Sequence, residues 1–212
     1  MAASYCYKYP RPAVTVDFVV FALVGATLKV LLIKRKHDPF AGSWAIPGGF
    51  LEMEEPIETA VRRELLEETK LDYKGPVAPI GVFGAPGRDP RGRTISLAHA
   101  TVIRPPLPEV GGADDAAEAC WLEPRAASPL AFDHDAIMEA ALAWLGRDVV
   151  EGQAGLAILP VEFGDPEIQA LFRAIGKNVR SATAWRNRLL REGRIKPVPR
   201  REGRYRSTMS SP

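Results

Sequence analysis

Cysteine is scarce in this chain of 212 residues, which contains only two, Cys6 and Cys120. Two cysteines so far apart supply neither a disulfide framework nor the spacing of a structural metal site. Cys6 lies in a polar beginning and Cys120 in a predicted strand, so neither is expected to be a catalytic nucleophile. We therefore expect two reduced thiols, which is typical of a cytoplasmic protein.

Long apolar runs are also lacking. The apolar stretch from Phe18 to Leu28 is too short to span a bilayer, and it is bounded by Asp17 and Lys29. The first ten residues have no apolar core of the kind that signal peptides carry. These absences exclude a membrane-spanning protein, and they predict a cytoplasmic location with no membrane partner.

Charge is nearly balanced over the whole chain, at +2, but it is divided unevenly. Residues 152–212 contain 12 Lys and Arg against 5 Asp and Glu, whereas the residues before them contain 16 basic and 21 acidic side chains. An acidic body followed by a basic tail indicates two parts with different partners. We therefore predict one domain over residues 1–151 and a second over 152–212.

The most acidic stretch runs from Gly49 to Leu71 and contains seven glutamates against three basic side chains. Pro56 suits the first turn of a helix, where a missing N–H costs nothing. No residue from there to Thr69 breaks a helix. Apolar side chains recur at three- and four-residue spacing and form one face of it, which predicts a helix with a buried side.

Three carboxylates, from Glu64, Glu67 and Glu68, stand at spacings of three and four residues and therefore share one helical face. One interpretation is a solvated acidic helix. The other is a cation site, because a divalent cation removes the repulsion between like charges. Ligation by carboxylates alone favours Mg²⁺ or Mn²⁺ over zinc, and magnesium commonly meets substrate phosphates.

The segment before this helix, from Trp44 to Gly49, contains two glycines that allow the backbone to come close to a ligand. Trp44 is interpreted as half core and half site wall. Arg63 adjoins the acidic cluster and is expected to pair with Glu55 or Glu67, holding the helix to the preceding loop.

This pattern resembles the Nudix box, in which glycine, glutamate and arginine positions recur at fixed spacing. The matching residues are Gly49, Glu55, Arg63, Glu64, Leu65, Glu67, Glu68 and Leu71. Lys70 stands where the family has glycine, and a left-handed conformation there costs lysine about 1 kcal/mol. The resemblance implies a hydrolase of nucleoside diphosphates linked to another moiety, using Mg²⁺ or Mn²⁺.

The same resemblance implies roles for the site residues. Glu64, Glu67 and Glu68 are expected to hold the metal and, together with Arg63, to serve catalysis. The carbonyl of Gly49 is a further candidate ligand. The general base in this family is a carboxylate, either in the box or on a later loop, and Glu64 is the candidate within the box.

Strands are predicted before and after the acidic helix, over residues 14–22, 29–36, 77–83, 94–103 and 119–122, and a second helix over 132–147. Mixed strands with two flanking helices indicate an α+β fold or a three-layer sandwich. The Nudix family has the latter, an α/β/α sandwich with a mixed sheet.

A loop rich in glycine and proline, Gly84–Arg93, carries Arg88, Arg91 and Arg93. Three interpretations are open: a solvated loop, a clamp for the substrate pyrophosphate, or a turn at the sheet edge. This loop, together with residues 9–12 and 130–135, resembles the ADP-ribose pyrophosphatase branch of the Nudix family. His134 is interpreted as a histidine at a helix start without a catalytic role.

The basic tail begins with a predicted linker over 152–155 and a short strand over 157–161. A helix then opens at Asp165, Ser181 caps a second one, and two extended segments surround a turn at Glu202 and Gly203. Two helices and a hairpin are the order of a winged helix, whose second helix enters a DNA groove. The candidate DNA contacts are Arg186, Arg188, Arg191, Arg201 and Arg204.

This layout resembles the Nudix-related transcriptional regulators of NAD metabolism, which join a domain that senses ADP-ribose to a winged helix. One hypothesis is therefore a pyrophosphohydrolase acting on ADP-ribose or a related compound. The other is a repressor that binds double-stranded DNA. Because every box carboxylate is present, hydrolysis is favoured. A small basic domain that only mediates dimerisation is the simpler alternative for the tail, and the resemblance implies a homodimer.

Overall fold

The computed structural model describes residues 7–113 and 115–208, so Cys6 lies outside the described residues. The strands are β1 (Ala13–Val24), β2 (Thr27–Arg35), β3 (Trp44–Ala45), β4 (Gly48–Phe50), β5 (Ala78–Phe83), β6 (Thr94–Ile103), β7 (Ala116–Leu122), β8 (Glu162–Gly164), β9 (Ile195–Pro197) and β10 (Arg204–Ser207). The helices are α1 (Ile57–Thr69), α2 (His134–Glu151), α3 (Ala154–Ile158), α4 (Asp165–Ala174) and α5 (Val179–Arg191).

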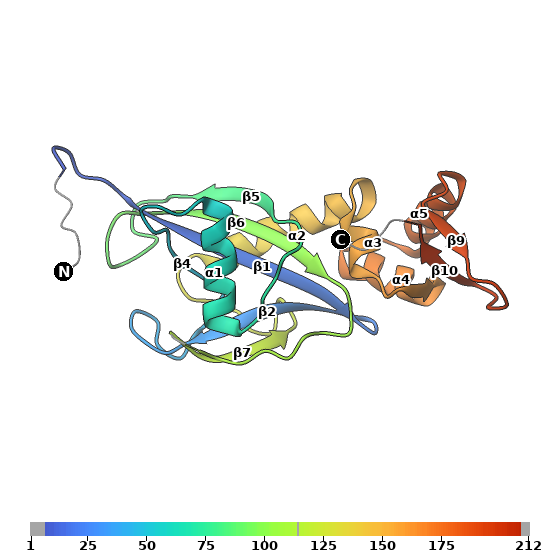
Figure 1. Cartoon of the computed structure of the whole chain (residues 1–212), viewed down its shortest axis with the longest axis horizontal. Coiled ribbons are helices and arrows are strands. Elements are labelled where there is room, and N and C mark those ends of the chain that lie inside the picture. Colours follow the sequence, from blue (N-terminus) through green and yellow to red (C-terminus); the bar gives the residue numbers. More distant parts are fainter. Residues whose placement is uncertain (1–6, 114, 209–212) are drawn as a thin grey trace.

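A mixed sheet forms the centre of the larger part of the molecule. Its strand order is β3-β2-β1-β6-β5, with β4 paired to β1 and β7 paired to β2. Strands β1 and β6 run parallel over ten residue pairs, and the other pairs are antiparallel. Helices α1 and α2 cover opposite faces of this sheet (Figure 1). The predicted α/β/α sandwich with a mixed sheet is therefore confirmed.

Strand β1 shows why the sheet needs a helix on each face. Val16 and Phe18 belong to the apolar cluster with the buried side of α1, whereas Val19 and Phe21 belong to the cluster with α2. Alternate side chains of a strand point to opposite faces, so a strand that is apolar at successive positions must be covered on both.

The two helices of the sandwich begin and end close to the predicted residues. Helix α1 ends at Thr69, and the cap residue Lys70 adopts the left-handed conformation, with φ of 63°, that the family's glycine would favour. Helix α2 begins at His134, two residues after the predicted start, because Phe132 has a φ of 55° and cannot be helical. It also continues four residues beyond the predicted end.

Two predictions for residues 152–161 are wrong. This segment is neither a linker nor a strand, because helix α3 occupies Ala154–Ile158. The carboxylate of Asp148 accepts hydrogen bonds from the N–H groups of Gln153 and Ala154, at 3.1 and 2.8 Å, and so satisfies the start of that helix. Gly155 is packed so tightly that a Cβ there would lie 2.7 Å from the ring of Trp185.

The tail has the predicted winged-helix-like order. Helices α4 and α5 are followed by β9 and β10, which form a three-stranded sheet with β8 in the order β8-β10-β9. One predicted cap is wrong, because Asn178 and not Ser181 precedes α5. The side chain of Asn178 accepts the N–H of Ser181 at 3.0 Å, which places Ser181 inside the first turn. Helix α4 begins at Asp165 itself, with Gly164 before it.

The tail and the sandwich share one hydrophobic core. Phe21 and Leu145 of the sandwich belong to the same buried cluster as Phe163 and Trp185 of the tail. The guanidinium of Arg188 donates to the carbonyl of Val150 at the end of α2. Figure 1 shows α3 and α4 between the sheet and α5. Over the described ranges, no helix is both long enough and apolar enough to cross a membrane.

Candidate active site

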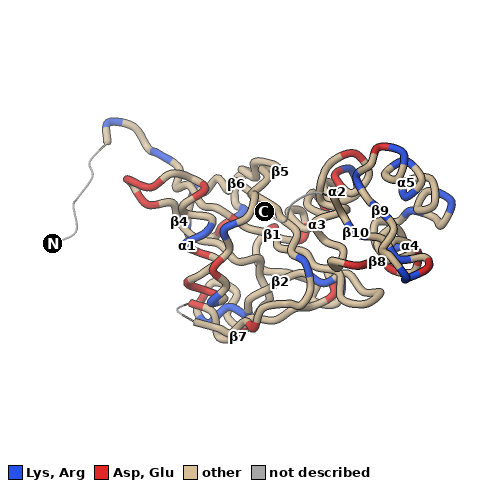
Figure 2. Tube along the Cα trace, turned by 45° about the vertical axis from the view of Figure 1, so that its right-hand side comes forward, with Lys and Arg blue, Asp and Glu red and all other residues tan. Residues whose placement is uncertain are grey.

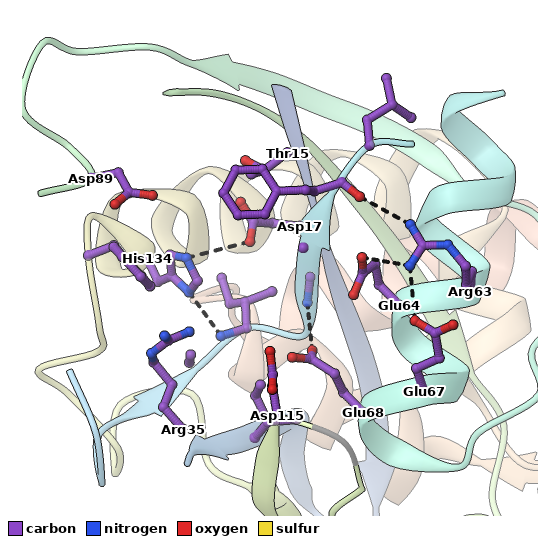
Figure 3. Close-up of a pocket in the computed structure, with 18 of the residues that line it drawn as sticks. Thr15, Asp17, Arg35, Arg63, Glu64, Glu67, Glu68, Asp89, Asp115 and His134 are labelled. Atoms are coloured by element: carbon purple, nitrogen blue, oxygen red, sulfur yellow. Dashed lines mark hydrogen bonds and ion pairs between the residues drawn. The ribbon is translucent and has the colours of Figure 1, made fainter. Parts of the chain in front are cut away.

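A pocket of about 380 Å³ opens between the sheet, α1 and the start of α2 (Figure 3). This volume lies within the range of sites for small molecules. Among its lining residues are Thr15, Asp17, Arg35, Gly48, Gly49, Phe50, Arg63, Glu64, Glu67, Glu68, Arg88, Asp89, Arg91, Asp115, Phe132 and His134. The three carboxylates that were predicted to share a helical face therefore do line one pocket.

Arg63 organises the acidic side of this pocket. Its Nε and Nη2 atoms bond both oxygens of Glu55, at 3.0 and 2.6 Å, and Nη2 also reaches the carbonyl of Phe50 at 3.1 Å. Its Nη1 atom donates to Glu64 at 2.8 Å and to Glu67 at 2.9 Å. The predicted pairing with Glu55 or Glu67 is thus satisfied by both at once, and the arginine ties α1 to the loop before it.

Glu68 is the most deeply placed of the three carboxylates, with 6% of its surface exposed. Its Oε2 atom accepts the N–H of Gly48 at 2.9 Å. Burial raises the pKa of Glu68 to about 8, helped by the nearby carboxylates of Glu64 and Asp17 and opposed by that N–H group. Burial likewise raises the pKa of Glu64. Both carboxyls therefore hold a proton more tightly than an exposed glutamate does.

Glycine at positions 48 and 49 allows the backbone to lie close to β1 and to the carboxylate of Glu64. A Cβ on Gly48 would lie 2.1 Å from the carbonyl oxygen of Val16, and one on Gly49 would lie 2.4 Å from the carboxylate of Glu64. Neither glycine has a positive φ, so close contact and not backbone conformation requires them. The turn between β3 and β4 can therefore lie directly against β1 and α1.

The donor set of this pocket suits a divalent cation that prefers oxygen. Three carboxylates and Gly49 line it, and Glu68 is a carboxyl whose pKa is raised by burial and which accepts a backbone N–H in place of a guanidinium. As placed, no three His, Cys, Asp or Glu side chains within residues 7–113 and 115–208 are close enough together to surround a metal. Arg63 donates to both Glu64 and Glu67, whereas Glu68 accepts the N–H of Gly48.

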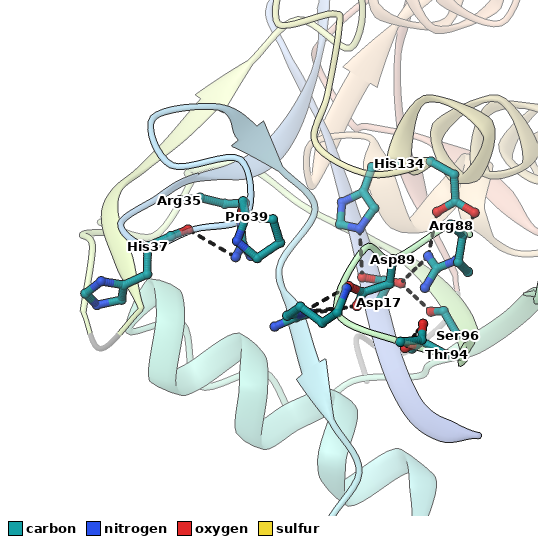
Figure 4. A network of polar contacts seen from close by, with 12 residues as sticks. Asp17, Arg35, His37, Pro39, Arg88, Asp89, Thr94, Ser96 and His134 are labelled. Carbon is teal, nitrogen blue, oxygen red and sulfur yellow. Dashed lines mark hydrogen bonds and ion pairs between the residues drawn. The ribbon is translucent and has the colours of Figure 1, made fainter. Parts of the chain in front are cut away.

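A second polar cluster includes the lining residues Asp17 and His134 (Figure 4). Nδ1 of His134 accepts the N–H of Ile46 at 3.0 Å, and Nε2 lies 3.5 Å from Asp17. The other oxygen of Asp17 accepts the hydroxyl of Ser96. Burial lowers the pKa of His134, so the imidazole is neutral near pH 7 and carries its proton on Nε2. This cluster fixes the turn that holds Glu68.

The three arginines of the Gly84–Arg93 loop have different positions. Arg88 is buried and forms a bidentate pair with Asp133, at 2.9 and 2.5 Å, which fastens the loop to the start of α2. Arg91 lines the pocket and pairs with Asp89 at 2.8 Å. Arg93 donates to the carbonyl of Gly84 at 2.6 Å and is not among the lining residues. Only Arg91 therefore combines a pocket position with substantial exposure.

Two other residues singled out in the sequence lie apart from this chemistry. Trp44 is partly buried against the core on the α2 side and is not among the pocket's lining residues. Cys120 is a free thiol in β7, and its hydrogen bond with Glu118, together with burial, raises its pKa to about 11. It is therefore protonated at neutral pH, as expected of a cysteine without a catalytic role.

Most arginines that were predicted to contact DNA are engaged within the chain. Arg186 pairs with Asp165, and Arg188 binds the end of α2. On the wing, Arg201 pairs with Glu162 at 2.7 Å, and Arg204 pairs with Glu167 at 2.8 Å. Arg191 is exposed. Within the described part of the chain, its side chain has no ion-pair partner, and the same holds for the exposed Lys177 and Arg180 of the same region.

Several lining residues were missed because their role depends on distant parts of the chain. Asp17 offered a signal, since a carboxylate inside an otherwise apolar strand must have a partner. The positions of Arg35, Phe50 and Phe132 offered none. They meet at the pocket only because the sheet and the start of α2 bring residues about 80 to 100 positions apart together.

A comparison with protein families finds that the NUDIX domain model matches residues 13–145. The ADP-ribose pyrophosphatase of Methanocaldococcus jannaschii is 41% identical over 140 residues, which cover 64% of this chain and 76% of that protein. The ADPR responsive transcriptional repressor NtrR of Acinetobacter baylyi is 30% identical over 190 residues, which cover 87% of this chain and 75% of that protein.

A solved structure extends the likeness to the tail. The crystal structure of Shewanella oneidensis NrtR complexed with a 27mer DNA is 25% identical, covers 93% of each chain and has a TM-score of 0.74. The family model alone spans more than half of the chain, including every residue of the acidic site, and the fold and the pocket agree with it. The chain therefore belongs to the Nudix family of hydrolases.

Proposed function

We propose that this Nudix hydrolase cleaves the pyrophosphate of ADP-ribose, or of a related nucleoside diphosphate derivative, and that it requires Mg²⁺ or Mn²⁺. The observation that carries this proposal is a single pocket lined by two sets of charged groups, carboxylates and guanidinium groups. Glu64, Glu67 and Glu68 supply the first set, and Arg35 and Arg91 supply the second. A substrate with a negatively charged diphosphate and a bound cation matches that division of charge.

The chain's own groups hold the reacting parts in place. Arg63 fixes one oxygen of Glu64 and one of Glu67, which leaves their other oxygens for a cation. The N–H of Gly48 orients Glu68, and the carbonyl of Gly49 would be a further ligand of the cation. When bound, the divalent cation neutralises charge on the diphosphate and lowers the pKa of water. Glu64 remains the candidate to accept the proton of the attacking water, and Arg35 and Arg91 supply positive charge to the pocket that receives the diphosphate.

The relative from M. jannaschii is named an ADP-ribose pyrophosphatase, which favours ADP-ribose as the first substrate to test. The experiment is a panel of nucleoside diphosphate derivatives incubated with the protein and Mg²⁺, Mn²⁺ or a chelator, with products separated by chromatography. The proposal expects AMP and ribose 5-phosphate from ADP-ribose, and no product in the presence of chelator. Failure to cleave any diphosphate of the panel with either metal would reject it.

A second function, binding of double-stranded DNA by the tail, has its own support. The tail has a winged-helix-like fold, and Lys177, Arg180 and Arg191 on or beside α5 are exposed. Figure 2 shows Lys and Arg recurring along α5, while Asp and Glu gather around α1. The A. baylyi relative is a transcriptional repressor, and the S. oneidensis structure contains DNA. We propose that residues 152–212 form a DNA-binding domain next to the catalytic domain of residues 1–151.

The DNA proposal predicts a specific loss of salt dependence. Replacing both Arg180 and Arg191 with alanine removes two phosphate contacts, so the slope of log K against log salt should fall by about 2. Fluorescence anisotropy with a duplex from the chain's own promoter region, between about 50 and 200 mM salt, measures it. Arg125→Ala, which removes an exposed positive charge from the sandwich and not from the tail, is the control. An unchanged slope in the double variant would contradict this assignment.

We also propose that the protein acts in the cytoplasm and forms a homodimer, as the resemblance to the regulators implies. A homodimer places two winged helices side by side, which matches the two-fold symmetry of many operators. Sedimentation of the purified protein measures the stoichiometry.

A further inference from the structure

Three phenylalanines lie at the pocket or beside it, and we call them the aromatic mouth: Phe50 and Phe132 line the pocket, and the ring of Phe40 contacts that of Phe132. Phe50 is the last residue of β4, and 46% of its surface is exposed. Phe40 lies between β2 and β3, and 42% of its surface is exposed. Its ring packs edge to face against that of Phe132, with 4.8 Å between the ring centres. Apolar rings gathered at the entrance of a polar pocket indicate a ligand part that is itself aromatic.

Two guanidinium groups lie against these rings. The guanidinium carbon of Arg91 is 5.0 Å from the ring centre of Phe50 and 5.5 Å from that of Phe132. Arg35 lies 4.9 Å from the ring centre of Phe132. A guanidinium is a flat cation that stacks on aromatic faces. The planar guanidinium of Arg91 therefore already contacts the rings of Phe50 and Phe132, which come from different parts of the chain.

The backbone supports a functional interpretation of this cluster. Phe40 has a φ of 64° and Phe132 a φ of 55°. Bulky residues seldom adopt this left-handed region, and such outliers cluster where a ligand site requires a side chain in one place. Arg35 holds the loop of Phe40 by donating to the carbonyls of His37 and Pro39. The two strained residues are the two whose rings touch each other.

Phe50 also connects the aromatic mouth to the acidic site. Its side chain contacts Arg91, whereas its carbonyl accepts a hydrogen bond from Arg63, which organises Glu64 and Glu67. Gly49, immediately before it, lies against Glu64. A ligand that stacks on Phe50 is therefore adjacent to the carboxylates. This is the arrangement that a nucleoside diphosphate needs, with its base and its phosphates a short distance apart.

We propose that the exposed ring of Phe50, with Phe132 and the guanidinium of Arg91 beside it, forms the subsite that binds the nucleobase of the substrate. This assignment rests on the proposed hydrolysis of a nucleoside diphosphate derivative, and it names the residues that distinguish a base-bearing substrate from other diphosphates. Stacking tolerates any base, because every base has a flat π face. Selection among bases therefore depends on other contacts.

The test compares the cleavage of two substrates by the wild-type protein and by two variants of Phe50. ADP-ribose carries a base, whereas diribosyl diphosphate keeps the pyrophosphate and both sugars but lacks it. Phe50→Leu preserves apolar bulk and removes the flat ring, and Phe50→Tyr retains the ring. We expect Phe50→Leu to lower the ratio of kcat/KM for ADP-ribose to kcat/KM for diribosyl diphosphate about 10-fold or more, chiefly through KM for ADP-ribose. Phe50→Tyr should restore that ratio.

Val82→Ala is the matched control, because Val82 is 68% exposed on β5 and is not a lining residue of the pocket. Its ratio should equal that of the wild-type protein. An equal loss on both substrates, or no loss on either, in Phe50→Leu would overturn the assignment. Phe50 is exposed, so its replacement leaves the core intact, and a circular dichroism melt checks this.

A measurement of ligand binding distinguishes failure of the subsite proposal from failure of the proposed hydrolytic function. Calorimetric titration of AMP and of ribose 5-phosphate, each with Mg²⁺, needs no turnover. If the base stacks at Phe50, AMP binds more tightly than ribose 5-phosphate, and Phe50→Leu reduces that preference about 10-fold. Equal affinity of the wild-type protein for the two ligands would reject the subsite. Selective AMP binding without hydrolysis of any substrate would instead reject the proposed function alone.

Discussion

Replacing Glu68 with glutamine should reduce kcat/KM for ADP-ribose about 1,000-fold. A bound metal ion contributes several kcal/mol of transition-state stabilisation, and each 1.4 kcal/mol corresponds to a factor of about ten. Glu68 is the carboxylate that Arg63 does not bond, and it is fixed by the N–H of Gly48. Glutamine keeps an oxygen for that N–H but loses the negative charge. The measurement is AMP release at saturating Mg²⁺.

The loss should not come from unfolding. Because the pKa of Glu68 is raised to about 8, its side chain is mostly neutral at pH 7 without metal, as glutamine is. At pH 7 the metal-free variant should therefore melt no lower than the metal-free wild type, because only the wild-type side chain ionises on unfolding. Glu58→Gln on the same helix is the control, since Glu58 is exposed and lies outside the pocket. A Glu68→Gln protein with full activity would show that Glu68 holds no essential metal.

Removal of metal should make stability depend on pH in an unusual direction. The pKa of Glu68 rises from about 4.5 in the unfolded chain to about 8 in the folded protein, so the folded state binds the proton more tightly between these values. The stability contributed by this proton is complete below about pH 4.5 and is lost as pH rises through about 8. One such group changes the free energy of unfolding by up to about 1.4 kcal/mol per pH unit.

Urea unfolding in the presence of chelator, at intervals from pH 5 to 8, measures this effect. His134 contributes a slope of opposite sign, because burial lowers its pKa and the buried neutral ring must be protonated in acid. The difference between wild type and Glu68→Gln removes that contribution. The wild type should lose stability relative to the variant as pH rises, and saturating Mg²⁺ should diminish the loss. Parallel curves with chelator would contradict the raised pKa.

The acidic side of the site was predictable because it lies within a single helix. Helical spacing alone places Glu64, Glu67 and Glu68 on one face, and Arg63 reaches its partners within about two turns. The sandwich was predictable for a similar reason, since apolar strands before and after one helix, followed by a second helix, leave few arrangements. The left-handed Lys70 followed from the position that the box reserves for glycine.

The rest of the site required the fold. His134 and Asp17 are far apart in the chain and meet only because α2 begins beside β1. Charge in the sequence could not distinguish Arg88, which is buried against Asp133, from Arg91, which faces the pocket. The tail shows the same limit, because Arg186 and Arg204 were expected to face DNA and instead pair with acidic side chains of the tail.

Direct measurement of Mn²⁺ binding tests the central claim, that carboxylates of α1 hold a divalent cation beside a pyrophosphate. Electron paramagnetic resonance of free Mn²⁺ during titration, with AMP present, reports bound metal without requiring turnover. The account predicts saturable binding to the wild type and binding weakened at least 10-fold in Glu68→Gln. Equal Mn²⁺ binding by the two proteins, or none by either, would contradict it.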